Sequence, residues 1–200
     1  TPGTEAYLTG NPDAWFARKE WPPTGERLTR ETFARYRAQG GYVVTHATDE
    51  AAAESWVRAA LASPFAVIAT DGILDHGVGH PRTASSFARV LGRSVREQRV
   101  LDLMDALRKM TLLPAGRLER RVPAMRRKGR IAVGMDADVV VFDPQRIIDR
   151  ATYREPTLPP VGMVCVIVNG WVVVRGGRLA EGIFPGQAVR APVSEARASR

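Results

Sequence analysis

Cysteine, histidine and lysine are all scarce in this sequence: 200 residues contain one cysteine, three histidines and three lysines. A lone cysteine, Cys165, excludes an internal disulfide framework and is typical of a reducing compartment, so we expect a cytoplasmic protein. The sequence has no apolar run of about 18 residues, so it predicts no transmembrane helix. Its start, TPGTEAYLTGNPDAW, has no basic stretch followed by an apolar core and predicts no signal peptide. The start also lacks Met, so we expect either a processed chain or part of a longer protein.

Acidic residues are too few to balance the arginines, and the formal net charge is +8. Such a balance can indicate a nucleic-acid partner. However, arginine and alanine are abundant throughout the chain, and the aromatic-rich strand motifs of RNA-binding sheets are absent. The densest basic segment, Arg117 to Arg130, is equally typical of a solvated linker or of an interface with acidic groups. We therefore expect no nucleic-acid partner and no membrane partner.

The pattern of apolar residues predicts an α/β protein, since helices and strands alternate over the first part of the chain. Residues 1–28 are rich in Pro, Gly and Thr and are expected to be irregular. Two helices and two short strands should then alternate as βα units around a parallel sheet, over residues 28–41, 42–46, 49–63 and 65–70. Thr29 is a suitable N-cap for the first of these helices.

The second part of the chain changes character near residue 125. Further helices are predicted over residues 85–97 and 101–118, and β-rich sequence follows Arg130. Asn169 and Gly170 separate two valine-rich runs and tolerate the positive φ of a type I′ turn. We therefore predict one antiparallel sheet containing Val139–Phe142 and Val166–Val174. The expected division is an α/β region over 1–125 and a β region over 126–200.

The stretch VIATDGILDHGVGHPR, residues 67–82, holds the densest group of chemically active side chains. Asp71 directly follows the expected strand 65–70, and ligands of α/β proteins bind at the carboxyl ends of such strands. A carboxylate there suits a metal ligand or a general base, but Asp71 is equally typical of an Asx turn. His76 and His80 follow in a glycine-containing loop. Neither has a histidine partner at HxH or HxxxH spacing, so the spacing predicts no complete metal site.

Several segments taken together resemble one known family: TDG, HPR, FARVLGRSVRE, LRKMTLLPAGRL, KGRIAVGMDADVVVFDP and VIVNGWVVV. They are similar to the C-terminal part of the N-acyl-D-amino-acid deacylases, or D-aminoacylases, of the amidohydrolase superfamily. The resemblance extends from about Thr24 to Arg190. It implies that residues 1–125 are the last strands and helices of a (β/α)8 barrel and that residues 126–200 are part of a small β-sandwich.

The resemblance also implies roles for individual residues. Asp71 corresponds to the aspartate at the end of the eighth barrel strand, which interacts with the metal and accepts a proton from the attacking water. Arg82 of HPR falls where family members bind the substrate carboxylate, with His80 beside it in the substrate-binding loop. The implied cofactor is zinc, which activates water and polarises the acyl carbonyl.

The family's other metal ligands have no counterpart in this chain, and His46 matches none of them. The remaining ligands, and the N-terminal part of the barrel that carries them, are therefore expected outside it. Residues 1–200 alone should then bind zinc no more tightly than micromolar and should not hydrolyse a small-molecule N-acyl amino acid. Two other hypotheses stay open. One is a hydantoinase-like or dihydroorotase-like cyclic-amide hydrolase, which would not need Arg82 as a carboxylate anchor. The other is a basic binding module without enzymatic activity.

Overall fold

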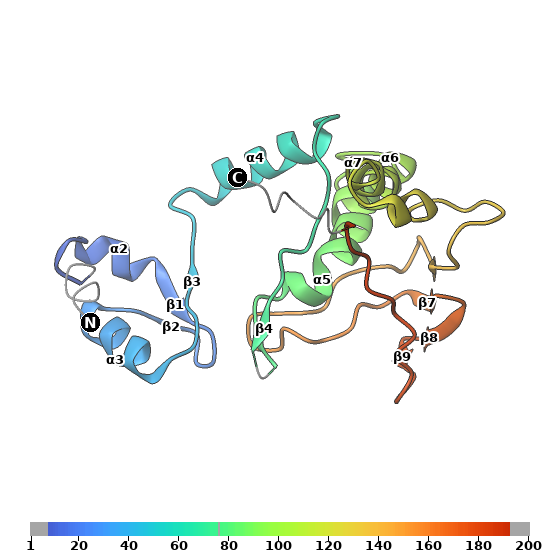
Figure 1. The fold of residues 1–200 in the computed structure, drawn as a ribbon. Helices are drawn as coiled ribbons and strands as arrows, with labels where there is room; N and C mark the ends of the chain where they lie inside the picture. The colour runs from blue at the N-terminus through green and yellow to red at the C-terminus, as the bar shows by residue number, and fades with distance from the viewer. Residues whose placement is uncertain (1–7, 76, 193–200) are drawn as a thin grey trace, which may run out of the picture. The chain divides into compact units, whose positions relative to one another are not determined.

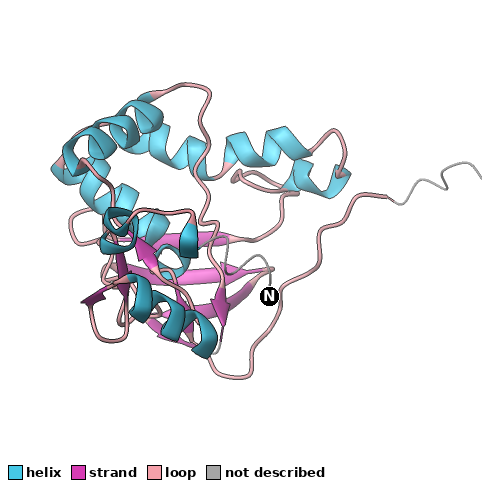
Figure 2. Ribbon diagram, turned by 90° about the vertical axis from the view of Figure 1, so that its left-hand side faces the viewer, coloured by secondary structure: helices cyan, strands magenta, loops and turns pink. Residues whose placement is uncertain are grey.

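The computed structural model describes residues 8–75 and 77–192, which form two compact units. The first unit contains residues up to Ala60 together with Asp71–Ala84 and Ala151–Leu158. The second contains Leu61–Thr70, Ser85–Arg150 and the chain from Pro159 onward. Figure 1 labels the elements along the chain, and Figure 2 distinguishes helices from strands. The chain is therefore a mixed α/β protein, as predicted. No helix within the described ranges is long and apolar enough to cross a membrane.

The first unit begins with short elements that the sequence did not predict. Within residues 1–28, expected to be irregular, lie helix α2 (Asp13–Ala17) and strands β1 (Lys19–Trp21) and β2 (Glu26–Arg27). Strand β1 pairs with β2 on one side and with β3 (Val44–Thr45) on the other, both antiparallel. These elements are ordered by an aromatic core rather than by their own propensity. The core consists of Phe16, Trp21, Leu28 and Phe33.

Two of the predicted helices are confirmed in position. Helix α3 (Arg30–Gln39) begins at Thr29, whose side chain accepts a hydrogen bond from the backbone of Thr32, and the two threonines form a reciprocal capping box. Helix α4 (Glu50–Ala62) follows β3. None of the α4 residues is buried, and its large apolar side chains Trp56 and Val57 are exposed.

The expected buried strand over residues 65–70 is not formed. Phe65 is 93% exposed and no ladder pairs this segment, whose Ile68 N–H donates to the carbonyl of Lys109. A strand needs a neighbour to satisfy its backbone groups, and the described residues supply none here. Every strand pair among the described residues is antiparallel, so the parallel sheet that the alternation predicted is not seen.

The helices of the second unit follow the predicted ranges with two local changes. Helix α5 (Arg82–Arg89), which starts in the first unit, continues as a π-helix, η1 (Val90–Glu97), instead of one uniform helix. The helix predicted over 101–118 is split into α6 (Leu103–Met110) and α7 (Leu112–Leu118). Pro114 explains the split, because its ring lacks the N–H that would bond the carbonyl of Met110. A short 3₁₀ helix, η2 (Pro123–Arg127), follows.

The predicted antiparallel sheet in the last part of the chain is confirmed. Its strand order is β6 (Val139–Phe142), β7 (Met163–Val168), β8 (Trp171–Arg175) and β9 (Arg178–Leu179). Asn169 (φ 49°) and Gly170 (φ 82°) form the turn between β7 and β8, both with positive φ as a type I′ turn requires.

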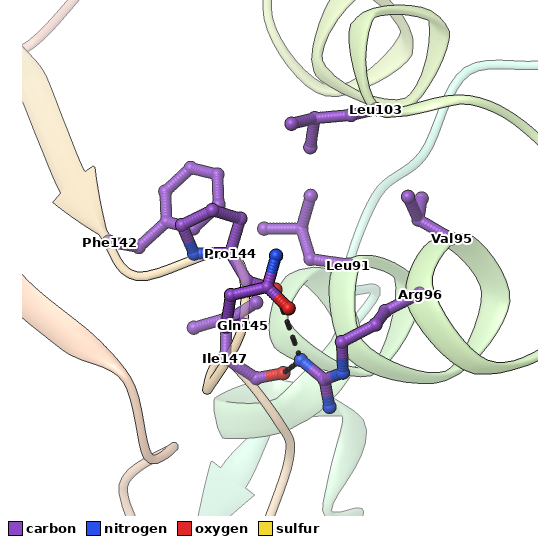
Figure 3. A pocket seen from close by; sticks show the side chains of 8 residues that line it. All are labelled: Leu91, Val95, Arg96, Leu103, Phe142, Pro144, Gln145 and Ile147. Atoms are coloured by element: carbon purple, nitrogen blue, oxygen red, sulfur yellow. Dashed lines mark hydrogen bonds between the residues drawn. The ribbon is translucent and has the colours of Figure 1, made fainter.

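Two basic side chains tie segments of the second unit together. Lys109 is completely buried, and its ammonium donates to the carbonyls of Leu61 and Ser63, which ties the segment before residue 70 to α6. Arg96 of η1 donates to the carbonyls of Pro144 and Ile147 beside a hollow of about 180 Å³ (Figure 3). The hollow is lined mainly by apolar side chains and carries no cluster of reactive groups.

Candidate active site

A two-stranded hairpin brings together the two ends of the stretch that the sequence singled out. Strand β4 (Leu74–Asp75) pairs with β5 (Val78–Gly79), with Leu74 opposite Gly79. Asp71 precedes this hairpin and Arg82 follows it, so residues eleven positions apart in sequence return to the same place. His76 lies outside the described residues.

Asp71 and Arg82 form a direct ion pair. The Arg82 guanidinium (Nη2) lies 2.8 Å from the Asp71 carboxylate (Oδ2), and their side chains are 43% and 84% exposed, respectively. Arg82 is also the first residue of α5, at the helix end where a negative charge is favoured. An ion pair so open to solvent contributes at most about 1 kcal/mol, so it opens readily for another partner.

The backbone around Asp71 is unusual in two respects. Asp71 itself has a φ of 45°, in the left-handed region where aspartate is tolerated better than most residues. Gly72 does not have positive φ; it is needed because a Cβ there would lie 2.3 Å from Thr83 Oγ1 and 2.5 Å from Thr83 Cα. The sharp turn is therefore made by Asp71, and Gly72 permits the close approach that sets Asp71 beside Arg82.

His80 is held on both sides of its ring. Its Nδ1 lies 3.1 Å from the backbone N–H of Arg82, and its Nε2 lies 3.2 Å from the hydroxyl of Tyr153. Tyr42 donates a hydrogen bond to the carbonyl of Gly79, next to His80. Burial, followed by the charge of Arg82, lowers the pKa of His80, and burial followed by Tyr153 raises the pKa of Tyr42. No spacing rule links Tyr42 or Tyr153 to HPR, so neither tyrosine could be predicted from the sequence.

His46 has a structural environment. Its Nε2 lies 2.9 Å from the carboxylate of Glu20 on β1, and its carbonyl accepts two hydrogen bonds from Arg18. These contacts explain a polar residue just after a short strand. His46 therefore links β1 to the residues after β3.

A zinc ion needs several ligands, and three or four protein ligands are usual. In residues 8–75 and 77–192 no group of three or more His, Cys, Asp or Glu side chains is placed to hold a metal ion. Asp71 alone, paired with a cation, does not make such a site. The donor set described here therefore does not fit zinc without further ligands.

Similarity to a known protein family covers Asp71, His80, Arg82 and Tyr153 of the candidate site. Residues 46–174 match the profile of the amidohydrolase family. The chain is 45% identical over 120 residues to N-acyl-D-glutamate deacylase of Alcaligenes xylosoxydans xylosoxydans, a match that covers 60% of this chain and 24% of the relative. It is 37% identical over 114 residues to D-aminoacylase of the same organism, covering 57% of this chain and 22% of the relative. The chain thus spans about a quarter of these relatives.

The fold is similar to a crystal structure of N-acyl-D-glutamate deacylase from Bordetella bronchiseptica, complexed with zinc and a phosphonate inhibitor that mimics the tetrahedral intermediate. The TM-score is 0.73 at 32% identity, over 94% of this chain and 39% of that one. A D-aminoacylase crystal structure matches with a TM-score of 0.69 at 29% identity, over 88% of this chain and 38% of that one. Because the family profile covers well over half of its residues, the chain belongs to the amidohydrolase family.

Proposed function

We propose that this chain is the C-terminal part of a zinc-dependent N-acyl-D-amino-acid deacylase. Residues 1–125 would supply the last strands and helices of a (β/α)8 barrel, and residues 126–200 part of a β-sandwich. The proposal is supported by 45% identity to an N-acyl-D-glutamate deacylase and by a fold match over 94% of the chain to a related enzyme. Segment 65–70, which precedes Asp71, joins no strand ladder among the described residues, as expected of a barrel strand that lacks its neighbours.

Asp71 is assigned as the proton acceptor in amide hydrolysis. A water oxygen attacks the acyl carbon, Asp71 takes the proton released, and the same proton passes to the amine nitrogen as the C–N bond breaks. The products are a carboxylate and a D-amino acid. An exposed carboxylate, in a solvent-accessible pair that opens at small cost, has the access that this role requires.

Arg82 is assigned as the anchor for the carboxylate of the amino-acid substrate. A guanidinium presents a planar fork that matches a carboxylate with two parallel hydrogen bonds. The Asp71 carboxylate at 2.8 Å demonstrates that the guanidinium is accessible to an anion from this side. Substrate binding then replaces one carboxylate by another on Arg82 and leaves Asp71 beside the reacting amide.

The zinc ligands other than Asp71 are assigned to the N-terminal part of the barrel, which is this chain's expected partner. Among the described residues, no group of three or more side chains could hold a metal ion. The assignment of these ligands therefore depends on the related deacylases. No step above depends on geometry at the metal.

The observation that carries the proposal is the Asp71–Arg82 pair, held by a hairpin within a chain that is 45% identical to a deacylase. The test is a substrate panel on the full-length protein containing this chain, loaded with zinc. It includes the N-acetyl derivatives of D-glutamate, D-aspartate and D-leucine, their L-enantiomers, hydantoin and dihydroorotate.

We expect hydrolysis of at least one N-acetyl-D-amino acid, with the L-enantiomers and cyclic amides turned over far more slowly. Preferential hydrolysis of hydantoin or dihydroorotate would support the cyclic-amide alternative instead. Steeply salt-dependent nucleic-acid binding without hydrolysis would support the basic binding module.

A further inference from the structure

The side chain of His80 lies between Arg82 and a tyrosine from a distant part of the chain. The backbone N–H of Arg82 is 3.1 Å from His80 Nδ1, and the hydroxyl of Tyr153 is 3.2 Å from His80 Nε2. The His80 and Tyr153 rings also meet edge to face, with centroids 5.0 Å apart and an interplanar angle of 75°. Both nitrogens of the imidazole are therefore engaged within the chain.

These two contacts determine the tautomer of His80. A backbone N–H can only donate, so Nδ1 must accept and cannot carry a proton. A neutral ring then carries its proton on Nε2, which donates to the Tyr153 hydroxyl oxygen. A protonated imidazolium would lose the Arg82 contact, and the lowered pKa of His80 favours the neutral form.

The Nδ1 contact fixes the backbone from which the Arg82 side chain extends. A side-chain acceptor on one residue that bonds the N–H two residues later has the geometry of an Asx turn. Here the side-chain acceptor is His80, at the position that Asn or Asp usually occupies in an Asx turn. The bond holds Pro81 and Arg82 at the start of α5, and Arg82 in turn directs its guanidinium to Asp71.

Two tyrosines fix this turn from other segments. Tyr153 lies in Ala151–Leu158, which joins the first unit, and it holds the far side of the imidazole. Tyr42, just before β3, donates to the carbonyl of Gly79, which precedes His80. The HPR turn is therefore bonded at Gly79 and at His80 by residues that are remote in sequence.

We propose that His80 and Tyr153 are positioning residues that set the Arg82 guanidinium for the substrate carboxylate, and that His80 does not itself contact substrate. The inference rests on the proposed function, in which Arg82 is the carboxylate anchor. Tyr153 keeps the imidazole proton on Nε2, and Nδ1 thereby remains an acceptor for the Arg82 N–H. The pair thus contributes to specificity for substrates with a free carboxylate.

Two isosteric variants of His80 separate its two contacts in the zinc-loaded full-length enzyme. His80→Asn places an oxygen where Nδ1 lies and keeps the Arg82 contact, whereas His80→Gln reaches Tyr153 but has no acceptor at the δ position. We expect His80→Gln to raise KM for an N-acetyl-D-amino acid about threefold to tenfold, as the loss of one hydrogen bond implies. His80→Asn should stay within about twofold of wild type. In both variants kcat should change little.

Tyr153→Phe keeps the ring contact and removes only the hydroxyl, so KM should rise by less than in His80→Gln. Tyr36→Phe is the matched control, because Tyr36 also loses a hydroxyl contact, to Glu26 at 2.6 Å, but lies outside this turn. The rise in KM should largely disappear with a substrate whose carboxylate is amidated. A purely structural role would raise KM for the charged and amidated substrates alike.

Equal damage by His80→Asn and His80→Gln would overturn the proposal, as would a loss confined to kcat. Failure of the proposed function itself is recognised separately, when Arg82→Lys does not distinguish charged from amidated substrates. The tautomer has its own readout in either case. The ¹⁵N spectrum of histidine-labelled protein should show His80, identified by its absence in His80→Asn, protonated on Nε2 at neutral pH. A ring protonated on Nδ1 contradicts the inference whatever the activity.

Discussion

The Arg82 guanidinium lies 2.8 Å from the Asp71 carboxylate, across the base of the β4–β5 hairpin. In the proposed reaction Asp71 accepts a proton, whereas Arg82 binds the substrate carboxylate. Their contact with each other is therefore a resting arrangement that substrate replaces. Separate substitutions can test the role of each residue and the structure that supports the pair.

Asp71→Asn keeps the size and hydrogen-bonding shape of the side chain but removes the base. We expect kcat of the full-length enzyme to fall by about two orders of magnitude or more, as the loss of a general base implies, with little change in KM. Steady-state kinetics on an N-acetyl-D-amino acid measures both constants. A near-normal kcat would show that Asp71 is a turn residue and not the general base.

Arg82→Lys keeps the charge but loses the planar fork. We expect mainly a rise in KM, with kcat/KM about 10- to 150-fold lower, the value for a lost charge-assisted contact. The loss should shrink when the substrate carboxylate is amidated, because no anion is then left to hold. A loss of equal size on both substrates would assign Arg82 to loop structure instead.

Gly72→Ala tests the close approach between the residue after Asp71 and the first turn of α5. The added methyl would lie 2.3 Å from Thr83 Oγ1 and 2.5 Å from Thr83 Cα, so backbone must shift. We expect a loss of about 1–3 kcal/mol in unfolding free energy, together with reduced activity. Gly116→Ala is the control, since no atom lies within 4 Å of its Cβ position and alanine favours the helix. Chemical denaturation of both variants measures the difference, and equal stability would contradict the packing described.

Asp149→Asn tests the buried carboxylate of the second unit. Asp149 is 9% exposed and accepts from Arg89 and Arg93, each at 3.1 Å. Loss of its charge should lower the unfolding free energy by about 2 kcal/mol, because two charge-assisted hydrogen bonds are weakened. The matched variant Asp13→Asn removes a carboxylate that binds Arg30 at 2.8 Å but is 88% exposed, and it should change stability little. Chemical denaturation measures both variants, and similar midpoints for Asp149→Asn and Asp13→Asn would contradict the expected difference in stability.

The pH dependence of stability should carry a contribution from His80. Burial, followed by the charge of Arg82, lowers its folded-state pKa below the ordinary value of 6.5, so the fold favours the neutral ring. The contribution is fully present above about pH 6.5 and declines as pH falls through the lowered folded-state pKa. Tyr153 and Arg82 face this ring. Denaturation midpoints of wild type and His80→Asn should therefore converge toward acidic pH. Parallel curves would show that His80 does not titrate differently on folding.

Local signals predicted the parts of the fold that are determined locally. Asn169 and Gly170 specify the β7–β8 turn by their own tolerance of positive φ, and Thr29 caps α3 through its own side chain. Residues 65–70 failed as a strand because a strand depends on neighbours that a single segment cannot supply. Elements α2, β1 and β2 formed although none was predicted. Their own propensity is weak, and the core that contains Phe16 and Trp21 orders them.

The residues of the candidate site were likewise predictable only where local sequence marks them. Asp71 could be found from the sequence because it directly follows an apolar segment, and Arg82 because HPR resembles the corresponding segment of the deacylases. Tyr153 could not, because it lies 73 positions from His80 and in a proline-rich segment without a catalytic spacing. The positive φ at Asp71 and the steric need for Gly72 beside Thr83 are likewise tertiary features that no local signal marks.

The interleaving of the two units has a consequence for how the polypeptide can be divided. The chain passes from one unit to the other five times, and the first unit is assembled from three separate stretches. No single cleavage can therefore excise either unit intact. A cut after Ala84 leaves His80 on one piece and Tyr153 on the other, while the His80–Tyr153 contact still joins them. Nicked protein should accordingly migrate as one species until denaturant is added. A gene truncated before residue 151 would encode Arg82 and its turn without Tyr153, which holds the far side of His80.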